Sequence, residues 1–151
     1  MHPTLRFSTF YLAGHYFGID VLAVQEILRP QEMTKVPLAP SVVEGLINLR
    51  GQIVTAIDLR RRLDLSERRA DQQPLNVVVQ TEDGAISLLV DEIGDVVEVS
   101  ETLFERPPET LRGTARDLIR GAYKVKDRLL LILDTERTVN LPADETGDGK
   151  N

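Results

Sequence analysis

The feature that most constrains the fold of this chain is a weak internal repeat of short apolar segments. A shift of 69 positions places residues 17–28 on residues 86–97, apolar on apolar, and Glu26 on Asp95. A shift of 76 positions superimposes the following hairpin on a later one, with Gly45 on Gly121, Arg50 on Lys126 and Asp58 on Asp134. Because closing a small sheet removes its exposed edges, the repeat predicts two similar antiparallel barrels of about five short strands each.

The local pattern is mostly that of strands. RFSTFYL and YFGIDV are rich in aromatic and branched residues and are separated by Ala13-Gly14-His15, which predicts a hairpin. In VLAVQEIL the apolar residues stand at helical spacing, so one or two helical turns are expected there. A proline-containing loop follows. The later segments are LNVVVQ, AISLLVDEIGDVVEV, the hairpin IRGAYKV with RLLLILD, and a short helix at TERTV.

The segment Asn48-Leu49-Arg50-Gly51 predicts a tight turn between two apolar runs. Asn48 suits the first position of a type I turn and Gly51 a left-handed position, which together favour a three-residue hairpin loop with a bulge. In the second copy Asp127 stands where Gly51 does. Turn chemistry explains Asn48 and Gly51, but it does not explain why an arginine stands at the apex.

Composition excludes several classes of protein. The chain has 151 residues, enough for one ordinary core, and carries a net charge of −6, which argues against nucleic acid as a partner. The run Arg60-Arg61-Arg62 is interpreted as a solvated basic turn. There is no cysteine, and no apolar run is long enough to span a membrane. The acidic segment 142–151 predicts a disordered tail.

Few residues indicate catalysis. His2 and His15 are the only histidines, so the sequence offers few histidine side chains for a metal site or a catalytic serine–histidine pair. Asp91 and Glu92 could form a carboxylate pair, and a hydrolase using them is a remote alternative. Charged residues on the wet face of a strand explain these carboxylates better. The sequence therefore predicts a binding module with no enzymatic activity, no cofactor and no metal, or else a purely structural barrel.

Three motifs in order, VQEI at residues 24–27, GLINLRG with IDL behind it, and VDEIGDVV at residues 90–97, resemble the CheW family of bacterial chemotaxis adaptors. The resemblance covers Phe7 to about Leu141. It implies an all-β fold of two intertwined five-stranded SH3-like barrels with a few short helices. It also implies a non-catalytic adaptor that couples methyl-accepting chemoreceptors to the regulatory domain of the histidine kinase CheA. The positions that match the family's receptor-binding residues are Val24, Glu26, Ile27, Gly45 and Arg50.

The resemblance also implies boundaries and a location. A CheW-like domain is expected over residues 5–141, with subdomains at about 14–70 and 71–141, the second possibly including the N-terminal strand. The protein is expected in the cytoplasm at receptor arrays, without membrane insertion. Glu26 is expected to lie exposed beside a groove between the barrels, and Ile27 to pack between them. An adaptor of a non-flagellar system, for twitching or surface sensing, stays an alternative.

Two departures from many relatives concern this groove. Thr55 stands where proline is common, which restores a backbone donor in a strand. Ser87 stands where glycine is common, and its side chain is expected near the groove.

Overall fold

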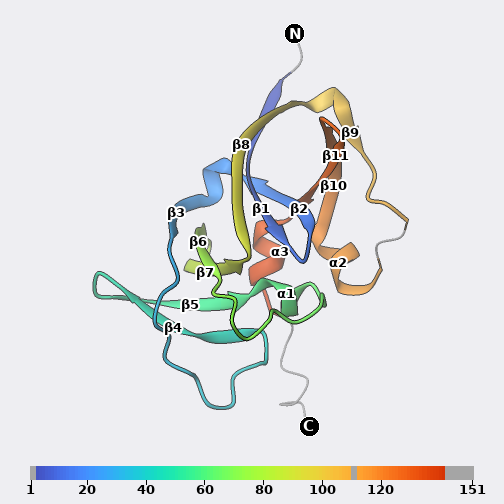
Figure 1. Ribbon diagram of the computed structural model, residues 1–151. Coiled ribbons are helices and arrows are strands. Elements are labelled where there is room, and N and C mark those ends of the chain that lie inside the picture. Colours follow the sequence, from blue (N-terminus) through green and yellow to red (C-terminus); the bar gives the residue numbers. More distant parts are fainter. Residues whose placement is uncertain (1–2, 110–111, 142–151) are drawn as a thin grey trace.

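A computed structural model describes residues 3–109 and 112–141 (Figure 1). His2 and the segment 142–151, for which the sequence predicts disorder, lie outside the described residues. The strands form two curved sheets, one toward each end of the molecule in Figure 1. The six-stranded sheet has the order β8-β1-β2-β11-β10-β9, with bounds Glu92–Ser100, Thr4–Leu12, His15–Asp20, Arg128–Leu133, Ile119–Val125 and Phe104–Glu105. The five-stranded sheet has the order β3-β6-β7-β5-β4, with bounds Val24–Leu28, Leu75–Thr81, Gly84–Val90, Gln52–Asp58 and Val43–Leu49.

Five short helices complete the described fold, and all of them lie between strands or after the last one. They are the 3-10 helices η1 and η2 and the α-helices α1, α2 and α3, with bounds Val21–Ala23, Glu101–Leu103, Leu59–Arg62, Gly113–Leu118 and Thr135–Val139. The fold is thus mostly β, as the sequence predicts, and the expected helix at TERTV is confirmed as α3.

The strand order confirms the internal repeat. When β1 to β5 are matched with β6, β7, β8, β10 and β11, the orders β8-β1-β2-β11-β10 and β3-β6-β7-β5-β4 become the same order. The register agrees as well, because the parallel partners Phe17 and Leu131 match the parallel partners Ile86 and Thr55 under the two shifts. Each sheet therefore combines the first two strands of one repeat with three strands of the other.

This exchange explains why the sheets do not follow the expected division near residue 70. Strand β2, at His15–Asp20, belongs to the six-stranded sheet, whereas β6 and β7 belong to the five-stranded sheet. The parallel pairs β2·β11 and β5·β7 bring together strands from opposite halves of the chain. The two sheets are intertwined, in agreement with the fold that the resemblance implies.

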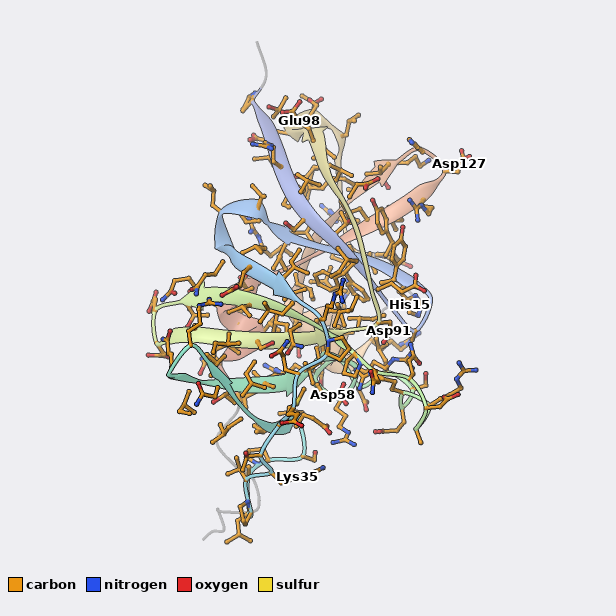
Figure 2. The ribbon with its side chains drawn as sticks, turned by 60° about the vertical axis from the view of Figure 1, so that its left-hand side comes forward. His15, Lys35, Asp58, Asp91, Glu98 and Asp127 are labelled. Carbon is orange, nitrogen blue, oxygen red and sulfur yellow. The ribbon has the colours of Figure 1, made fainter. Side chains whose placement is uncertain are left out.

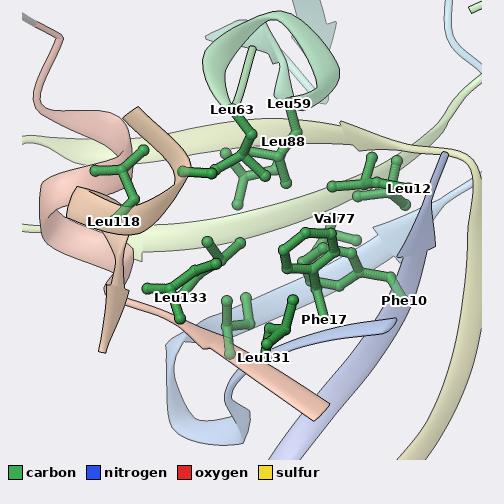
Figure 3. Close-up of a cluster of buried hydrophobic side chains, with 14 of the residues drawn as sticks. Phe10, Leu12, Phe17, Leu59, Leu63, Val77, Leu88, Leu118, Leu131 and Leu133 are labelled. Carbon is green, nitrogen blue, oxygen red and sulfur yellow. The ribbon is translucent and has the colours of Figure 1, made fainter. Parts of the chain in front are cut away.

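Within the part of the chain that the structure describes, three clusters of buried side chains stabilise this arrangement. One contains only residues of the six-stranded sheet, including Phe7, Tyr123 and Leu130, and another contains only residues of the five-stranded sheet, including Ile47 and Val54. The largest cluster draws on both sheets and on α1 and α2 (Figure 3). It joins the two sheets into one body. Its labelled members are Phe10, Leu12, Phe17, Leu59, Leu63, Val77, Leu88, Leu118, Leu131 and Leu133.

The predicted barrels are only partly closed. Among the described residues, the edge strands β3 and β4 form no ladder with each other. Beyond β3, a single bridge joins Thr34 to Leu46, with backbone N–H···O distances of 2.9 and 2.8 Å. A continuous strand needs backbone donors and conformational freedom that proline lacks, and the segment between β3 and β4 contains Pro30, Pro37 and Pro40. This segment therefore pairs with the edge of β4 through one bridge and not through a ladder.

The predicted helical turns in VLAVQEIL are confirmed only for η1, where the Asp20 carboxylate accepts the Leu22 N–H at 2.9 Å. Val24–Leu28 is strand β3, and its register on β6 shifts between Val24 and Glu26. The helical spacing of the apolar residues does not correspond to a single buried face, because burial alternates along β3 and leaves Ile27 exposed. Likewise AISLLVDEIGDVVEV is divided at Asp91 into β7 and β8, which belong to different sheets.

Candidate functional site

The tip of the β4–β5 hairpin is a two-residue turn. Leu49 pairs with Gln52, and the residues between them, Arg50 and Gly51, have φ values of 53° and 89°. Positive φ at both central positions defines a type I′ turn, which matches the twist of the flanking strands. The predicted three-residue loop is therefore wrong, although Asn48 does hold the turn by accepting the Gly51 N–H at 2.8 Å.

The β10–β11 hairpin also differs from the prediction, because Val125 pairs with Arg128 and the turn again has two residues. There the positive φ belongs to Lys126, at 56°, and not to Asp127, so the assignment of the left-handed position to Asp127 is wrong. Arg50 and Lys126 thus occupy equivalent apices with nearly the same φ. The turn explains the conformation of the apex residue and leaves its side chain free for another role.

Arg50 forms an ion pair with Glu26 of β3 through Nη2 and Oε2. Two of the predicted site residues, 24 positions apart, are therefore brought into contact. The pair joins the hairpin tip to β3, which lies at the opposite edge of the same sheet from β4. The Arg50 side chain stays 70% exposed, whereas that of Glu26 is 25% exposed. Such an exposed pair adds little to stability because water and salt screen it.

Ile27 follows Glu26 in β3, and its side chain lies on the exposed face of the strand. It is 45% exposed, so the expectation that it packs between the barrels is wrong. Neighbouring side chains of a strand point to opposite faces, and in β3 it is Val24, Glu26 and Leu28 that are the more buried. Val24 packs against the cluster shared by the two sheets.

Ile53 is a further exposed apolar residue, and sequence reasoning missed it. It lies on β5, opposite Asn48 in the ladder, and is 61% exposed. Its position two residues after the predicted turn is the sequence signal that could have identified it. Ile53 is therefore an exposed apolar residue close to the hairpin tip that carries Arg50.

Gly45 is buried and does not form part of the surface. A Cβ at this position would lie 2.8 Å from the Thr34 carbonyl oxygen and 3.0 Å from the Met33 Cβ. Glycine therefore permits the segment beyond β3 to cross closely over β4 and to form the bridge at Thr34. Any influence of Gly45 on binding acts through the position of that segment.

The two departures from the family pattern lie inside the sheet. Thr55 pairs with Leu46 on one side and with Ile86 on the other, so its backbone donor stands in a central strand. Ser87 is completely buried, and its hydroxyl donates to the Asn76 Oδ1 at 2.8 Å, so the expectation that it lies near a groove is wrong. Asn76 in turn donates to the Arg29 carbonyl oxygen at 3.0 Å, at the end of β3.

The basic run at residues 60–62 is not a solvated turn. Arg60 and Arg62 are buried, at 8% and 9% exposure. Arg62 donates to the carbonyl oxygens of Thr138, at 2.8 Å, and Arg137, at 3.0 Å, and both acceptors lie near the C-terminal end of α3. A short α1 at the junction of the sheets directs these arginines inward, where the long guanidinium groups reach acceptors that the sequence does not reveal.

Arg60 forms a buried ion pair with Asp91, at the point where the chain passes from one sheet to the other. Its Nε lies 3.0 Å from Oδ1 and its Nη2 2.5 Å from Oδ2, and Asp91 also accepts the Ala13 N–H at 2.8 Å. Arg68 lies against Asp91 and Asp58 in the same cluster. Figure 2 shows Asp58 and Asp91 close together in the middle of the molecule, with His15 at the neighbouring turn.

This pairing determines the charge of Asp91. Burial alone would raise the pKa of the carboxyl, but the hydrogen bonds from Arg60 and the Ala13 N–H and the charges of Arg60 and Arg68 outweigh burial. The pKa of Asp91 is therefore lowered from its ordinary value of 3.8. A general acid or base needs a pKa closer to neutral, so Asp91 is a structural anion. It does not lie on the wet face of a strand, as the sequence suggested, whereas Glu92, Asp95 and Glu98 are exposed.

Within residues 3–109 and 112–141, no group of three or more His, Cys, Asp and Glu side chains could hold a metal ion. In the same part of the chain, no helix is long and apolar enough to cross a membrane.

Comparison with known proteins gives a consistent result. A family model described as CheW-like domain matches residues 6–143. The chemotaxis protein CheW of Treponema pallidum is 32% identical over 133 residues, which cover 85% of this chain and 78% of that protein. The CheW protein of Bacillus subtilis is 31% identical over 135 residues, 89% of this chain and 86% of that protein. The crystal structure of the scaffolding protein TtCheW from Thermoanaerobacter tengcongensis matches with a TM-score of 0.81 and 27% identity, over 92% of this chain and 94% of that one.

The two intertwined sheets, together with the family match and the match to a scaffolding protein, define a non-catalytic adaptor with an SH3-like fold. The chain belongs to the CheW family. It is a chemotaxis adaptor, and the hydrolase alternative has no support.

Proposed function

We propose that this chain couples the cytoplasmic tips of methyl-accepting chemoreceptors to the regulatory domain of a CheA-type histidine kinase. Residues 5–141 act as one unit in this role, in the cytoplasm at receptor arrays and without membrane insertion. The receptor tip binds the surface around Arg50 and Glu26, to which Ile27 contributes directly and Val24 and Gly45 contribute through the position of β3 and β4.

The observation that carries this proposal is the exposed ion pair at the hairpin tip. The described hydrogen bond to Glu26 uses Nη2 of Arg50, and the guanidinium keeps further donors for a partner. A planar group with several donors suits the carboxylates and carbonyl oxygens of a helical hairpin. The exposed side chains of Ile27 and Ile53 supply the apolar contact that such a polar anchor needs to give a stable complex.

The test is assembly of a ternary complex from purified protein, a receptor tip fragment and the kinase regulatory domain, all from the same organism. Receptors and kinases of the flagellar and of any twitching or surface-sensing system are assayed in parallel, which also distinguishes the non-flagellar alternative. Wild type is expected to assemble, and Lys124→Ala, an exposed change in the six-stranded sheet, is the control.

A charge swap distinguishes two roles for Arg50. The double variant Arg50→Glu/Glu26→Arg keeps an ion pair at the hairpin tip but reverses the charge presented to a partner. If the pair only supports the hairpin, the double variant binds the receptor like wild type. The proposal expects it to bind as weakly as Arg50→Ala, and wild-type affinity in the double variant contradicts a direct contact.

A further inference from the structure

The loop between β3 and β4 carries a strained and fully exposed leucine. The Ala39 N–H donates to the Val36 carbonyl oxygen at 3.3 Å, and Leu38, at the third position of this turn, has φ of 68°. Pro37 at the second position fixes its own φ near −65°. A turn with proline at its second position and positive φ at its third is a type II turn.

Leucine is a poor residue for that position. Type II turns favour glycine or asparagine there, because the Cβ of other L-residues is crowded by the backbone when φ is positive. Packing does not compensate for this, since the Leu38 side chain is 99% exposed. Neither the turn nor the core accounts for an apolar side chain at this place, so the fold would be at least as stable without it.

The loop also restricts the backbone that carries Leu38. Pro37 and Pro40 restrict the backbone on both sides, and the Val43 N–H donates to the Pro40 carbonyl oxygen at 2.9 Å. The bridge between Thr34 and Leu46 fixes the other end of the loop to β4. A side chain presented on a rigid turn loses little conformational entropy when it binds, which is the usual requirement for an apolar anchor.

The charge around this anchor differs from that of the rest of the molecule. Residues 29–42 contain Arg29 and Lys35 against a single carboxylate, Glu32, whereas the whole chain has a net charge of −6. The Lys35 side chain is 84% exposed, and its ammonium is 3.8 Å from the Glu44 carboxylate. Figure 2 places Lys35 at the end of the molecule opposite Glu98, where the loop projects beyond the sheet. A complementary surface therefore has an apolar pocket with a carboxylate at its rim.

We propose that Leu38 inserts into an aliphatic pocket of the kinase regulatory domain, with a carboxylate of that domain facing Lys35. The inference rests on the proposed function, and it adds the surface that the second partner uses. The loop and the β4–β5 hairpin tip project in different directions from the five-stranded sheet (Figure 1). One partner can therefore occupy the surface around Arg50 while another occupies Leu38.

The experiment compares wild type with Leu38→Gly and Leu38→Asn, two residues that accept the positive φ of the turn. Melting temperature is measured for each, and calorimetry gives Kd for the purified kinase regulatory domain and, separately, for the receptor tip fragment. Both variants are expected to melt at or above the temperature of wild type. Both are expected to bind the kinase domain at least about tenfold more weakly, the effect of removing a central apolar anchor, and to bind the receptor fragment like wild type.

Leu22→Asn is the matched control, because Leu22 is 88% exposed but lies on η1, away from the loop. It is expected to leave both affinities unchanged. The inference is overturned if the Leu38 variants bind the kinase domain like wild type, if only the glycine variant is weakened, or if Leu22→Asn is weakened equally. It is also overturned if the Leu38 variants lose affinity for the receptor fragment but keep wild-type affinity for the kinase domain. If wild type binds neither fragment, the proposed function fails, and the inference fails with it.

Discussion

At the scale of single residues, position in a strand or turn decides which side chains are available to a partner. Glu26 and Ile27 are neighbours in β3, yet one is paired with Arg50 while the other is 45% exposed. Arg50 stands at an apex because Asn48 and Gly51 make the turn. Fold and function are therefore separable at Arg50, and this makes it the most informative residue to change.

For Arg50→Ala we expect a change in unfolding free energy of about 0.5 kcal/mol or less, since the lost ion pair is exposed. Receptor affinity is expected to fall by about 1.5–3 kcal/mol, or roughly tenfold or more, because a charged hydrogen bond is lost. Denaturant unfolding and calorimetric titration measure the two quantities. Equal affinities of variant and wild type would show that Arg50 does not contact the receptor.

Ile27→Ala tests the apolar part of the same surface. Because Ile27 is about half exposed, its truncation is expected to cost less than about 1 kcal/mol of stability, well below the cost of a buried isoleucine. The receptor affinity of Ile27→Ala is expected to fall. The receptor affinity of Ile53→Ala, measured in parallel, shows whether the apolar surface extends to β5. A large loss of stability in Ile27→Ala would mean that the side chain is buried in solution.

At the scale of elements, backbone conformation and end capping determine which short segments form. The β4–β5 turn needs positive φ at two successive residues, and α3 has only five residues, too few to be stable alone. The turn depends on the positive φ of Gly51, whereas α3 depends on long-range hydrogen bonds from Arg62. Each dependence gives a prediction about stability.

Gly51→Val is expected to destabilise the protein by about 1–3 kcal/mol, because a branched residue is forced to the φ of 89° that Gly51 adopts. Gly51→Asn is the control and is expected to cost much less, since asparagine tolerates this region. Thermal unfolding of the two variants measures the difference. If valine and asparagine behave alike, the turn is not the type I′ turn described.

Arg62→Met is expected to cost about 2–3 kcal/mol, because it removes a buried charged donor from carbonyl oxygens at the end of α3. Burial lowers the pKa of Arg62, but an arginine stays charged at neutral pH, so the donor is always present. Arg61→Met, in the half-exposed neighbour, is expected to cost less than about 1 kcal/mol. Hydrogen exchange of the α3 amides should increase in the first variant only.

At the scale of the whole molecule, strand exchange and a shared core make the two sheets one cooperative unit. Each sheet takes strands from both repeats, and the largest buried cluster contains residues of both. The Arg60–Asp91 pair lies where the chain crosses between them. The molecule is thus expected to unfold as a whole and to respond as a whole to a change at that crossing.

We expect fragments 14–70 and 71–141 to remain unfolded when expressed separately, since each lacks strands that complete its sheets. Amide chemical-shift dispersion of each fragment measures this directly, and a mixture of fragments 1–70 and 71–151 tests whether they fold together. The intact chain should show a single unfolding transition by fluorescence and by circular dichroism. An independently folded fragment would contradict the exchange.

The pKa of Asp91 predicts how acid affects stability. Because this pKa is lower in the folded state than its ordinary value of 3.8, the contribution of Asp91 is fully present above the unfolded value and is lost as pH falls through the folded pKa. At neutral pH Asp91→Asn is expected to cost about 3 kcal/mol, since it leaves the buried Arg60 without a charged partner. The difference from wild type should shrink below pH 4, and a constant difference at all pH values would argue against the ion pair.

The sequence by itself determined the strand content, the repeat and its register, because apolar periodicity and turn residues act over short distances along the chain. Through the family resemblance it also made Arg50 and Glu26 candidates, but only the folded hairpin brought them into contact. Tertiary structure decided that Arg60 and Asp91 are buried partners, that Ser87 bonds Asn76 inside the sheet, and that Ile27 faces water. The burial of each side chain depends on which strands become neighbours, and here strand exchange set those neighbours across distances that no local pattern records.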